Sequence, residues 1–417
     1  MRFAAGFWLF AWAVWWVILH EGAQGVSPVL ALIGLLSIPV LLKKLPHTSK
    51  DVLAFILFLT WAVISSIWSP AGDGSFFTFD LSGENLAINS PGLRIGLVGL
   101  ILLFAYWAMH QLTPKTYGQG LWAARIGIGT QVILMVVWLF AFGAVLAYGM
   151  EVSDANNLNQ NMIRIVNACV LCVPLIPLLI PDRLAIARIP AFLLCMVGLL
   201  IISIRPQVDA QAAMLAVIAV TLVSALACLV GRSIYRWLGY ATAAVTFAMP
   251  LLIKALLITA SGAGAAIPVS FQSRLDSYAY TLSKIQDRLI FGWGLEASKT
   301  WDDTKRIIAP NGVEVDYKIV PGHPHNMGLH LWAETGLIGA LLLSCAIVFL
   351  GRRLADSQAG SRATAIAGAG IWGGALIFSG FSYSLWNDAY WALILFIATA
   401  VLAVGKALPA DSKTGAK

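Results

Sequence analysis

Residues 212–230 read AAMLAVIAVTLVSALACLV, an apolar run without a charged side chain. Bilayer hydrocarbon is about 30 Å thick, so a helix needs about 20 residues to cross it. In lipid the backbone N–H and C=O groups find no partners outside their own segment, so such a run must be helical. The segment therefore predicts a transmembrane helix.

The composition extends this prediction to the whole chain. Of 417 residues, 59% are hydrophobic and only 11% are charged, whereas a soluble domain carries roughly 25% charged residues. We therefore expect an all-α polytopic membrane protein that forms a single domain over residues 1–417. About twelve runs are long enough to be transmembrane helices: Phe3–Leu19, Val26–Leu42, Val52–Trp68, Leu93–Met109, Leu121–Tyr148, Met162–Ile180, Ala191–Ile204, Ala212–Val230, Leu238–Ala260, Met327–Leu350, Ala363–Phe381 and Ala389–Val404.

Lysine and arginine favour the cytoplasmic side of a membrane. With both termini in the cytoplasm, the cytoplasmic loops hold most of these residues, whereas the opposite loops Ser69–Pro91 and Ser382–Asp388 hold none. The net charge of +7 then reflects membrane topology, and we expect no nucleic-acid partner. The cytoplasmic set is Lys43, Lys44, Lys50, Lys115, Arg183, Arg188, Arg232, Arg236, Arg352, Arg353, Arg362, Lys406, Lys413 and Lys417.

One connection is long, residues 261–324 between the ninth and tenth spans. Connections of this length are usually functional or hold structure of their own. Apolar residues recur at spacings of four and three, which predicts an amphipathic helix on the membrane surface or against the bundle. Gly292-Trp293-Gly294 then ends the pattern. The apolar positions are Phe271, Leu275, Tyr278, Leu282, Ile285 and Leu289.

Several arginines stand where this topology expects no positive charge. Arg94, Arg164 and Arg205 lie at the extracytoplasmic ends of their spans, and Arg274 opens the long connection. Each could reach lipid phosphates or pair with an acid such as Asp209 or Asp276. Together they would bind a polyanion, and diphosphate matches the geometry of the guanidinium group.

Arg288 follows Arg274 by fourteen residues, about 21 Å along a continuous helix. One diphosphate is too small to contact both side chains. We favour Arg274 for the diphosphate and a helix or loop partner for Arg288, which we keep among the candidate substrate-binding residues.

Residues 321–330, PGHPHNMGLH, hold three of the six histidines. Imidazole is the usual side chain for proton transfer near neutral pH. A zinc site is less favoured, because no cysteine is near and Glu334 is the one supporting carboxylate. A plain junction between loop and helix is the other alternative, with Asn326 as the N-cap of the tenth span.

Three motifs together resemble the O-antigen ligase and polymerase superfamily. They are Arg274-Leu275-Asp276-Ser277-Tyr278, Phe291-Gly292-Trp293-Gly294, and His323-Pro324-His325-Asn326 followed by Leu329, Trp332, Glu334, Gly336, Leu337, Ile338 and Gly339. The match directly covers about residues 270–340. An earlier Ser-Arg pair of the family is replaced here by Ser203-Ile204-Arg205, a departure from its pattern.

The resemblance implies a glycosyltransferase that needs no metal or other cofactor. Such an enzyme transfers a glycan from undecaprenyl diphosphate to a hydroxyl group at the periplasmic face of the bacterial inner membrane. Its catalytic residues would be Arg205 and Arg274, which bind the diphosphate, and His325, which activates or orients the acceptor hydroxyl. Candidate substrate-binding residues are Arg164, Arg94, Asn326, His323, Glu334 and Arg288.

The acceptor distinguishes the leading interpretation from its alternatives. An O-antigen ligase transfers the glycan to lipid A–core, and a polymerase extends it on its lipid carrier. A transporter or flippase would place charged or broken segments at the middle of the membrane, where Pro174 and Pro177 are the best candidates. We favour the ligase, acting as a monomer among membrane lipids with residues 261–324 as its periplasmic catalytic loop.

Overall fold

The computed structural model describes residues 2–20, 25–42, 48–72, 79–80, 87–88, 90–110, 114–152, 155–206, 208–262, 269–308, 314–357 and 361–407. Helices dominate these residues, as the composition predicts. The α-helices are α1 (Arg2–Ala13), α2 (Trp15–His20), α3 (Val26–Leu41), α4 (Lys50–Ser65), α5 (Pro91–His110), α6 (Pro114–Val152), α7 (Ala155–Cys172), α8 (Ile176–Leu179), α9 (Arg188–Ser203), α10 (Gln211–Val230), α11 (Ile234–Gly262), α12 (Val269–Asp287), α13 (Met327–Asp356), α14 (Arg362–Phe381) and α15 (Asp388–Ala407).

Short elements complete the chain between these helices. The 3-10 helices are η1 (Ser66–Trp68), η2 (Val173–Leu175), η3 (Asp182–Ala187), η4 (Gly231–Ser233) and η5 (Ala297–Thr300). Two antiparallel hairpins consist of β1 (Phe79–Asp80) with β2 (Ala87–Ile88), and β3 (Thr304–Ile308) with β4 (Glu314–Lys318). The hairpins are additions that the apolar pattern does not predict.

The described residues contain nine segments long and apolar enough to cross a membrane. This finding confirms a multi-pass membrane protein. One segment, Gln211–Ala260, holds both α10 and α11, which η4 joins. The first predicted span is divided into the short helices α1 and α2. The total of twelve spans stays a prediction.

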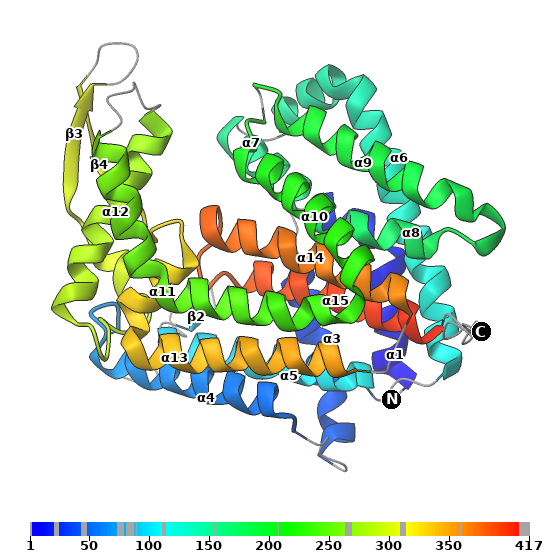
Figure 1. Cartoon of the computed structure of the whole chain (residues 1–417), viewed down its shortest axis with the longest axis horizontal. Helices are drawn as coiled ribbons and strands as arrows, with labels where there is room; N and C mark the ends of the chain where they lie inside the picture. Colours follow the sequence, from blue (N-terminus) through cyan, green and yellow to red (C-terminus); the bar gives the residue numbers. More distant parts are fainter. Residues whose placement is uncertain are drawn as a thin grey trace.

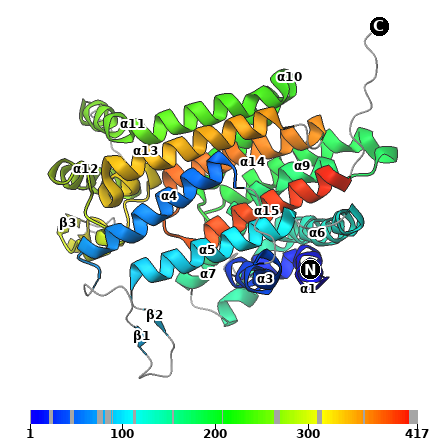
Figure 2. The ribbon, with the colours of Figure 1, turned by 90° about the horizontal axis from the view of Figure 1, so that it is seen from below.

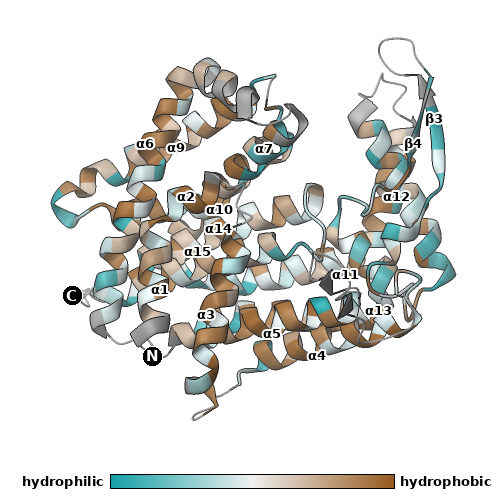
Figure 3. Cartoon of the chain, turned by 180° about the vertical axis from the view of Figure 1, so that it is seen from behind, coloured by the Kyte–Doolittle hydropathy of each residue, from teal (hydrophilic) through white to brown (hydrophobic). Residues whose placement is uncertain are grey.

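The long helices pack side by side and place α12 at one end of the bundle. α13 packs against α4 and α11, α10 against α14, and α3 against α5. Figures 1 and 2 show α12 and β3 where α13 begins. Figure 3 shows hydrophobic residues along α4, α5 and α9, whereas β3 is hydrophilic. Which side of the membrane each end faces stays a prediction.

The amphipathic pattern in the long connection is confirmed as helix α12. Its buried positions are Tyr278, Leu282 and Ile285, which join the main hydrophobic core. The helix ends at Asp287, so Leu289 lies in the following turn and is exposed, as is Phe271. The strand β3 is held to α12 by Lys305, whose ammonium group donates to Asp276 at 2.8 Å.

Helix α13 is interrupted at Gly336, where φ is 65° and ψ is −164°. The interruption leaves backbone groups on both sides without their usual helical partners. Segment 289–294 supplies them: the N–H groups of Trp293 and Gly294 donate to the carbonyls of Ala333 and Glu334 at 2.8 and 2.9 Å. In return, Leu337 N–H donates to the Leu289 carbonyl at 2.9 Å. The FGWG motif is therefore inserted into the break in α13.

This insertion requires glycine at two positions. A Cβ atom on Gly292, where φ is +70°, would lie 2.5 Å from the Glu334 carbonyl oxygen. A Cβ atom on Gly336 would collide with the carbonyl group of Ile290. Trp61 and Trp68 close the arrangement by donating to the carbonyls of Thr335 and Gly292 at 2.9 and 3.2 Å. The backbone of segment 289–294 therefore lies directly against Gly336.

We expect Gly336→Ala to destabilise the protein by several kcal/mol, because its backbone conformation is essentially restricted to glycine and costs other residues about 1–3 kcal/mol before the collision is counted. Thermal unfolding in detergent measures the effect. Gly129→Ala in α6 is the control, since its added Cβ meets no atom within 4 Å and helical Gly→Ala changes stabilise by about 0.5–1 kcal/mol. Equal melting temperatures for both variants would contradict the role of Gly336.

Candidate active site

His325 occupies an unusual backbone position immediately before α13. Its φ is +53°, a conformation uncommon for residues other than glycine and often found at functional sites. The neighbouring Asn326 side chain accepts the N–H of Leu329 at 2.9 Å, which confirms it as the N-cap of α13. The cap and the helix fix where the His325 backbone lies.

Three histidines of the quoted segment form one cluster. The His323 and His325 ring centroids are 4.3 Å apart, and those of His323 and His330 are 6.1 Å apart. His323 Nδ1 accepts the backbone N–H of His325 at 3.1 Å. In the part of the chain that the structure describes, no His, Cys, Asp and Glu side chains are grouped as a metal site would require.

His325 has a lowered pKa. Burial is the largest cause, and the positive charge of Arg274 acts in the same direction. A hydrogen bond from the imidazole to the Ser382 carbonyl opposes them. Because one ring nitrogen donates to that carbonyl, the other nitrogen of the neutral ring carries a lone pair. His325 can therefore act as a proton acceptor near neutral pH.

His323 is held neutral more strongly. Burial lowers its pKa to about 3, with further contributions from His325, His330 and Lys299. Its Nδ1 already accepts the His325 N–H, so the ring proton lies on Nε2. This arrangement suits a residue that positions the His325 backbone.

Arg274 brings a positive charge to the same place from α12. Its guanidinium lies 5.9 Å from the Phe271 ring centroid, and its charge acts on His325. Asp276, one acid considered as its partner, instead accepts from Lys305 at 2.8 Å and from Tyr317 at 2.6 Å. Among the described residues Arg274 makes no ion pair, which leaves its charge available to an anion.

Glu334 lies beneath this cluster and is completely buried. One carboxylate oxygen accepts from Ser298 N–H at 3.0 Å, and the other accepts from Glu296 N–H at 2.7 Å and from the Trp386 indole. His330 Nε2 lies 2.9 Å from Glu334. His330 Nδ1 accepts the Leu385 N–H at 3.2 Å, so its ring proton faces the carboxylate. With both oxygens occupied by protein donors, we propose a positioning role for Glu334.

The other predicted arginines lie around the cluster or apart from it. Arg94 forms an ion pair with Glu296, and Arg288 lies over the Trp293 ring at 4.2 Å, the loop partner that the sequence favoured. Arg164 donates to Asn161 at 3.3 Å. Arg205 follows α9 and donates to the Leu139 carbonyl of α6 at 2.8 Å. Figure 1 shows α6 and α9 apart from α12.

The segment Ser382–Asn387 is a part of the site that sequence analysis missed. It supplies the Ser382 carbonyl to His325, the Leu385 N–H to His330 and the Trp386 indole to Glu334. Tyr383 extends the segment to α7, because its hydroxyl accepts from Asn167 at 3.2 Å. Two of these contacts use backbone groups, which leave no signature in a sequence. The aromatic residues Tyr383 and Trp386 were the one sequence feature that could have pointed to this segment.

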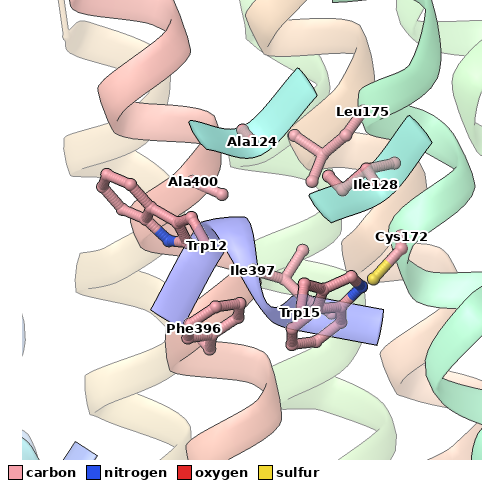
Figure 4. Close-up of a pocket in the computed structure, with 9 residues that line it drawn as sticks. All are labelled: Trp12, Trp15, Ala124, Ile128, Cys172, Leu175, Phe396, Ile397 and Ala400. Carbon is pink, nitrogen blue, oxygen red and sulfur yellow. The ribbon is translucent and has the colours of Figure 1, made fainter. Parts of the chain in front are cut away.

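A pocket elsewhere in the bundle has a different character. It is lined by apolar residues of α1, α2, α6, α7, η2 and α15, and Figure 4 shows the Trp15 indole nitrogen pointing toward the sulfur of Cys172. No histidine or charged side chain lines it. It therefore offers no groups for proton transfer or anion binding.

Residues 163–344 match the family model described as O-Antigen ligase. This segment of the chain is similar to the O-antigen ligase family. The match confirms the resemblance that the motifs indicate, and its range includes Arg164, Arg205, Arg274 and His325. The protein is thus a membrane enzyme of O-antigen or polysaccharide assembly, of glycosyltransferase type. Comparisons with curated proteins and with solved structures gave no match.

We expect the His325 side chain to be mostly neutral at pH 6.5, the ordinary pKa of histidine, since burial and Arg274 both disfavour the imidazolium form. Arg274→Gln should raise the pKa of His325, because it removes the nearby positive charge. Titration of the ring carbon signals in histidine-labelled protein measures both values, and the spectrum of His325→Gln assigns the signal. An unchanged pKa of His325 in the Arg274→Gln variant would show that the charge of Arg274 does not act on His325.

Proposed function

We propose that this protein is a lipopolysaccharide O-antigen ligase. It transfers O-antigen or a related polysaccharide from undecaprenyl diphosphate to a hydroxyl group of lipid A–core at the periplasmic face of the bacterial inner membrane, without a metal. The observation that carries the proposal is a buried histidine, His325, whose pKa is lowered by burial and by the charge of Arg274, an arginine that makes no ion pair among the residues that the structure describes. The family match gives the reaction class.

The reaction needs a base for the acceptor and a positive charge for the leaving group. The acceptor hydroxyl passes its proton to the free nitrogen of His325 as its oxygen bonds to the anomeric carbon. The bond from that carbon to the diphosphate oxygen breaks, and its electron pair stays with the diphosphate. Arg274 stabilises the developing negative charge, and the proton on His325 is later released to solvent.

This order of events inverts the anomeric centre, since the hydroxyl attacks from the side opposite the diphosphate. Attack by a neutral hydroxyl is slow unless its proton is removed in the same step, which is the contribution of His325. The Ser382 carbonyl keeps the ring in the required tautomer, as a hydrogen-bond acceptor on the second nitrogen does for catalytic histidines generally. In this proposal, Arg205 and Arg164 make further contacts with the donor.

Arg205 follows α9 and contacts α6, whereas Arg274 lies in α12, which packs against α13. We propose that the donor lies between these groups, with its diphosphate toward Arg274 and His325. The polyprenyl chain then lies along the apolar helix surfaces, where its burial follows from the hydrophobic effect.

Transfer by purified protein in liposomes tests the residue roles. His325→Ala should lower the rate at least about 100-fold, the range that general base catalysis contributes. Arg274→Ala should lower it by a similar factor, and Arg274→Lys should recover part of it, because lysine keeps the charge and loses the bidentate geometry. Full activity of the folded His325→Ala protein would contradict the proposal.

Deletion of the gene tests the acceptor. Loss of a ligase should leave long glycan chains on undecaprenyl diphosphate and lipid A–core without them. Loss of a polymerase should instead leave single repeat units on lipid A–core. Electrophoresis of lipopolysaccharide together with extraction of the lipid-linked glycan distinguishes the two outcomes. Single repeat units on lipid A–core would contradict the ligase assignment and favour a polymerase.

A further inference from the structure

The segment Ser382–Asn387 is bonded to two helices that lie on different sides of it. Toward α13, the Leu385 N–H donates to the His330 ring at 3.2 Å. Toward α7, the Asn167 side chain donates to the Tyr383 hydroxyl at 3.2 Å. Figure 1 shows α7 apart from α12, the helix that carries Arg274. Tyr383 is thus the residue through which the candidate site reaches α7.

Arg164 lies one helical turn from Asn167 on α7. Residues three apart lie on the same face of a helix, with Cβ atoms about 5–6 Å apart, so Arg164 and the Tyr383 hydroxyl share that face. The positive charge of Arg164 acts on Tyr383, where it opposes the rise in pKa that burial causes. Arg164 donates to the neutral side chain of Asn161, and among the described residues it makes no ion pair. A positive charge without a carboxylate therefore lies beside the hydroxyl.

The Tyr383 hydroxyl accepts one hydrogen bond and keeps its own proton available. Within the described part of the chain it donates to no acceptor. The ring is stacked on Tyr390, with centroids 4.5 Å apart, and meets the Phe378 ring edge-on at 6.3 Å. The side chain is only partly buried, so a ligand can reach it. Tyr383 is therefore a fixed hydrogen-bond donor without an acceptor in the protein.

Asn167 gives a second indication of a ligand here. It is 1% exposed, and its Oδ1 atom has no hydrogen-bond partner among the described residues. A buried amide oxygen without a partner is destabilising, and such a group calls for an explanation. The one bond that the amide makes goes to Tyr383. Because Asn167 occupies a lone pair of the hydroxyl oxygen, it directs the hydroxyl proton away from α7.

The two phosphates of the proposed donor need different partners. The phosphate linked to the sugar lies at His325 and Arg274, because the bond that breaks is there. The other phosphate carries the polyprenyl chain and extends away from the sugar. Tyr383 is two residues from Leu385, which is bonded to the histidine cluster, and two residues span at most about 7 Å. A diphosphate that extends from the histidines toward α7 therefore meets Tyr383.

We propose that the Tyr383 hydroxyl donates a hydrogen bond to the lipid-linked phosphate of the donor, beside Arg164. The proposal rests on the glycosyl transfer proposed above and adds a substrate-binding residue and the phosphate that it contacts. Asn167 is a positioning residue that acts through the hydroxyl. No bond to the lipid-linked phosphate breaks during transfer, so the contact is equally strong in the ground state and the transition state. It therefore contributes to the affinity for the donor and leaves kcat unchanged.

Binding of two lipids tests which phosphate Tyr383 contacts. Undecaprenyl phosphate carries the lipid-linked phosphate alone, whereas undecaprenyl diphosphate carries both. Thermophoresis of the purified full-length protein in detergent measures the Kd of each lipid. Tyr383→Phe keeps the ring and should raise both Kd values by about tenfold, as expected for a hydrogen bond to a charged group. Arg274→Gln should raise the Kd of undecaprenyl diphosphate alone.

Two further variants separate the contact from a structural effect. Tyr390→Phe is the matched control, because it removes the hydroxyl of the stacked ring, which donates to the Ala375 carbonyl at 2.8 Å; both Kd values should stay unchanged. Asn167→Leu should raise both Kd values in the wild-type background. In the Tyr383→Phe background it should have no further effect, because its action passes through the hydroxyl. Thermal unfolding shows which variants are folded.

Each outcome decides one part of the proposal. Unchanged Kd values of both lipids in folded Tyr383→Phe protein would overturn the contact and leave the glycosyl transfer standing. An increase confined to undecaprenyl diphosphate would assign Tyr383 to the sugar-linked phosphate and overturn the proposal equally. If phosphatidylglycerol bound as tightly and lost as much affinity in Tyr383→Phe, the site would belong to a membrane lipid. Absence of transfer by the wild-type protein would overturn the proposed function, whichever way the Kd values change.

Discussion

The interrupted backbone of α13 is the feature on which the candidate site depends. A helix surrounded by apolar groups cannot leave carbonyl and N–H groups unpaired, since each costs several kcal/mol. The break at Gly336 is therefore stable because segment 289–294 pairs with both of its sides. This pairing attaches the end of the long connection to the helix that carries His330 and Glu334, and so determines where residues 294–300 lie.

Glu334 extends this attachment to the rest of the site. Its carboxylate is bonded to residues 296–298, to His330 and to Trp386, which belong to three segments far apart in the sequence. A buried carboxylate is costly unless every lone pair is used, and here the donors come from all three segments. The segment Ser382–Asn387 is thereby held where the Ser382 carbonyl meets His325. The tautomer of the proposed base follows from contacts that begin at Glu334.

Sequence alone predicts the parts of this molecule that depend on periodicity and composition. The apolar runs predicted the membrane helices, and the spacing of Tyr278, Leu282 and Ile285 predicted α12, because burial selects side chains at fixed intervals. The FGWG turn and Gly336 were noticed as motifs, but their pairing was not predicted. Backbone hydrogen bonds between residues 289–294 and 333–338 leave no periodic pattern, and glycine alone does not name its partner. The backbone contacts of Ser382 and Leu385 escape for the same reason.

The neighbourhood of Arg274 and His325 also couples donor binding to catalysis on the proposed mechanism. Without a donor, burial and, to a smaller extent, the guanidinium charge lower the pKa of His325 and so make the imidazole a weak base. A bound diphosphate would neutralise that charge, and the pKa of His325 would rise toward its ordinary value. A base becomes more effective as its pKa approaches the working pH. The histidine would therefore be strongest as a proton acceptor when the glycan to be transferred is in place, and weakest when only water could react.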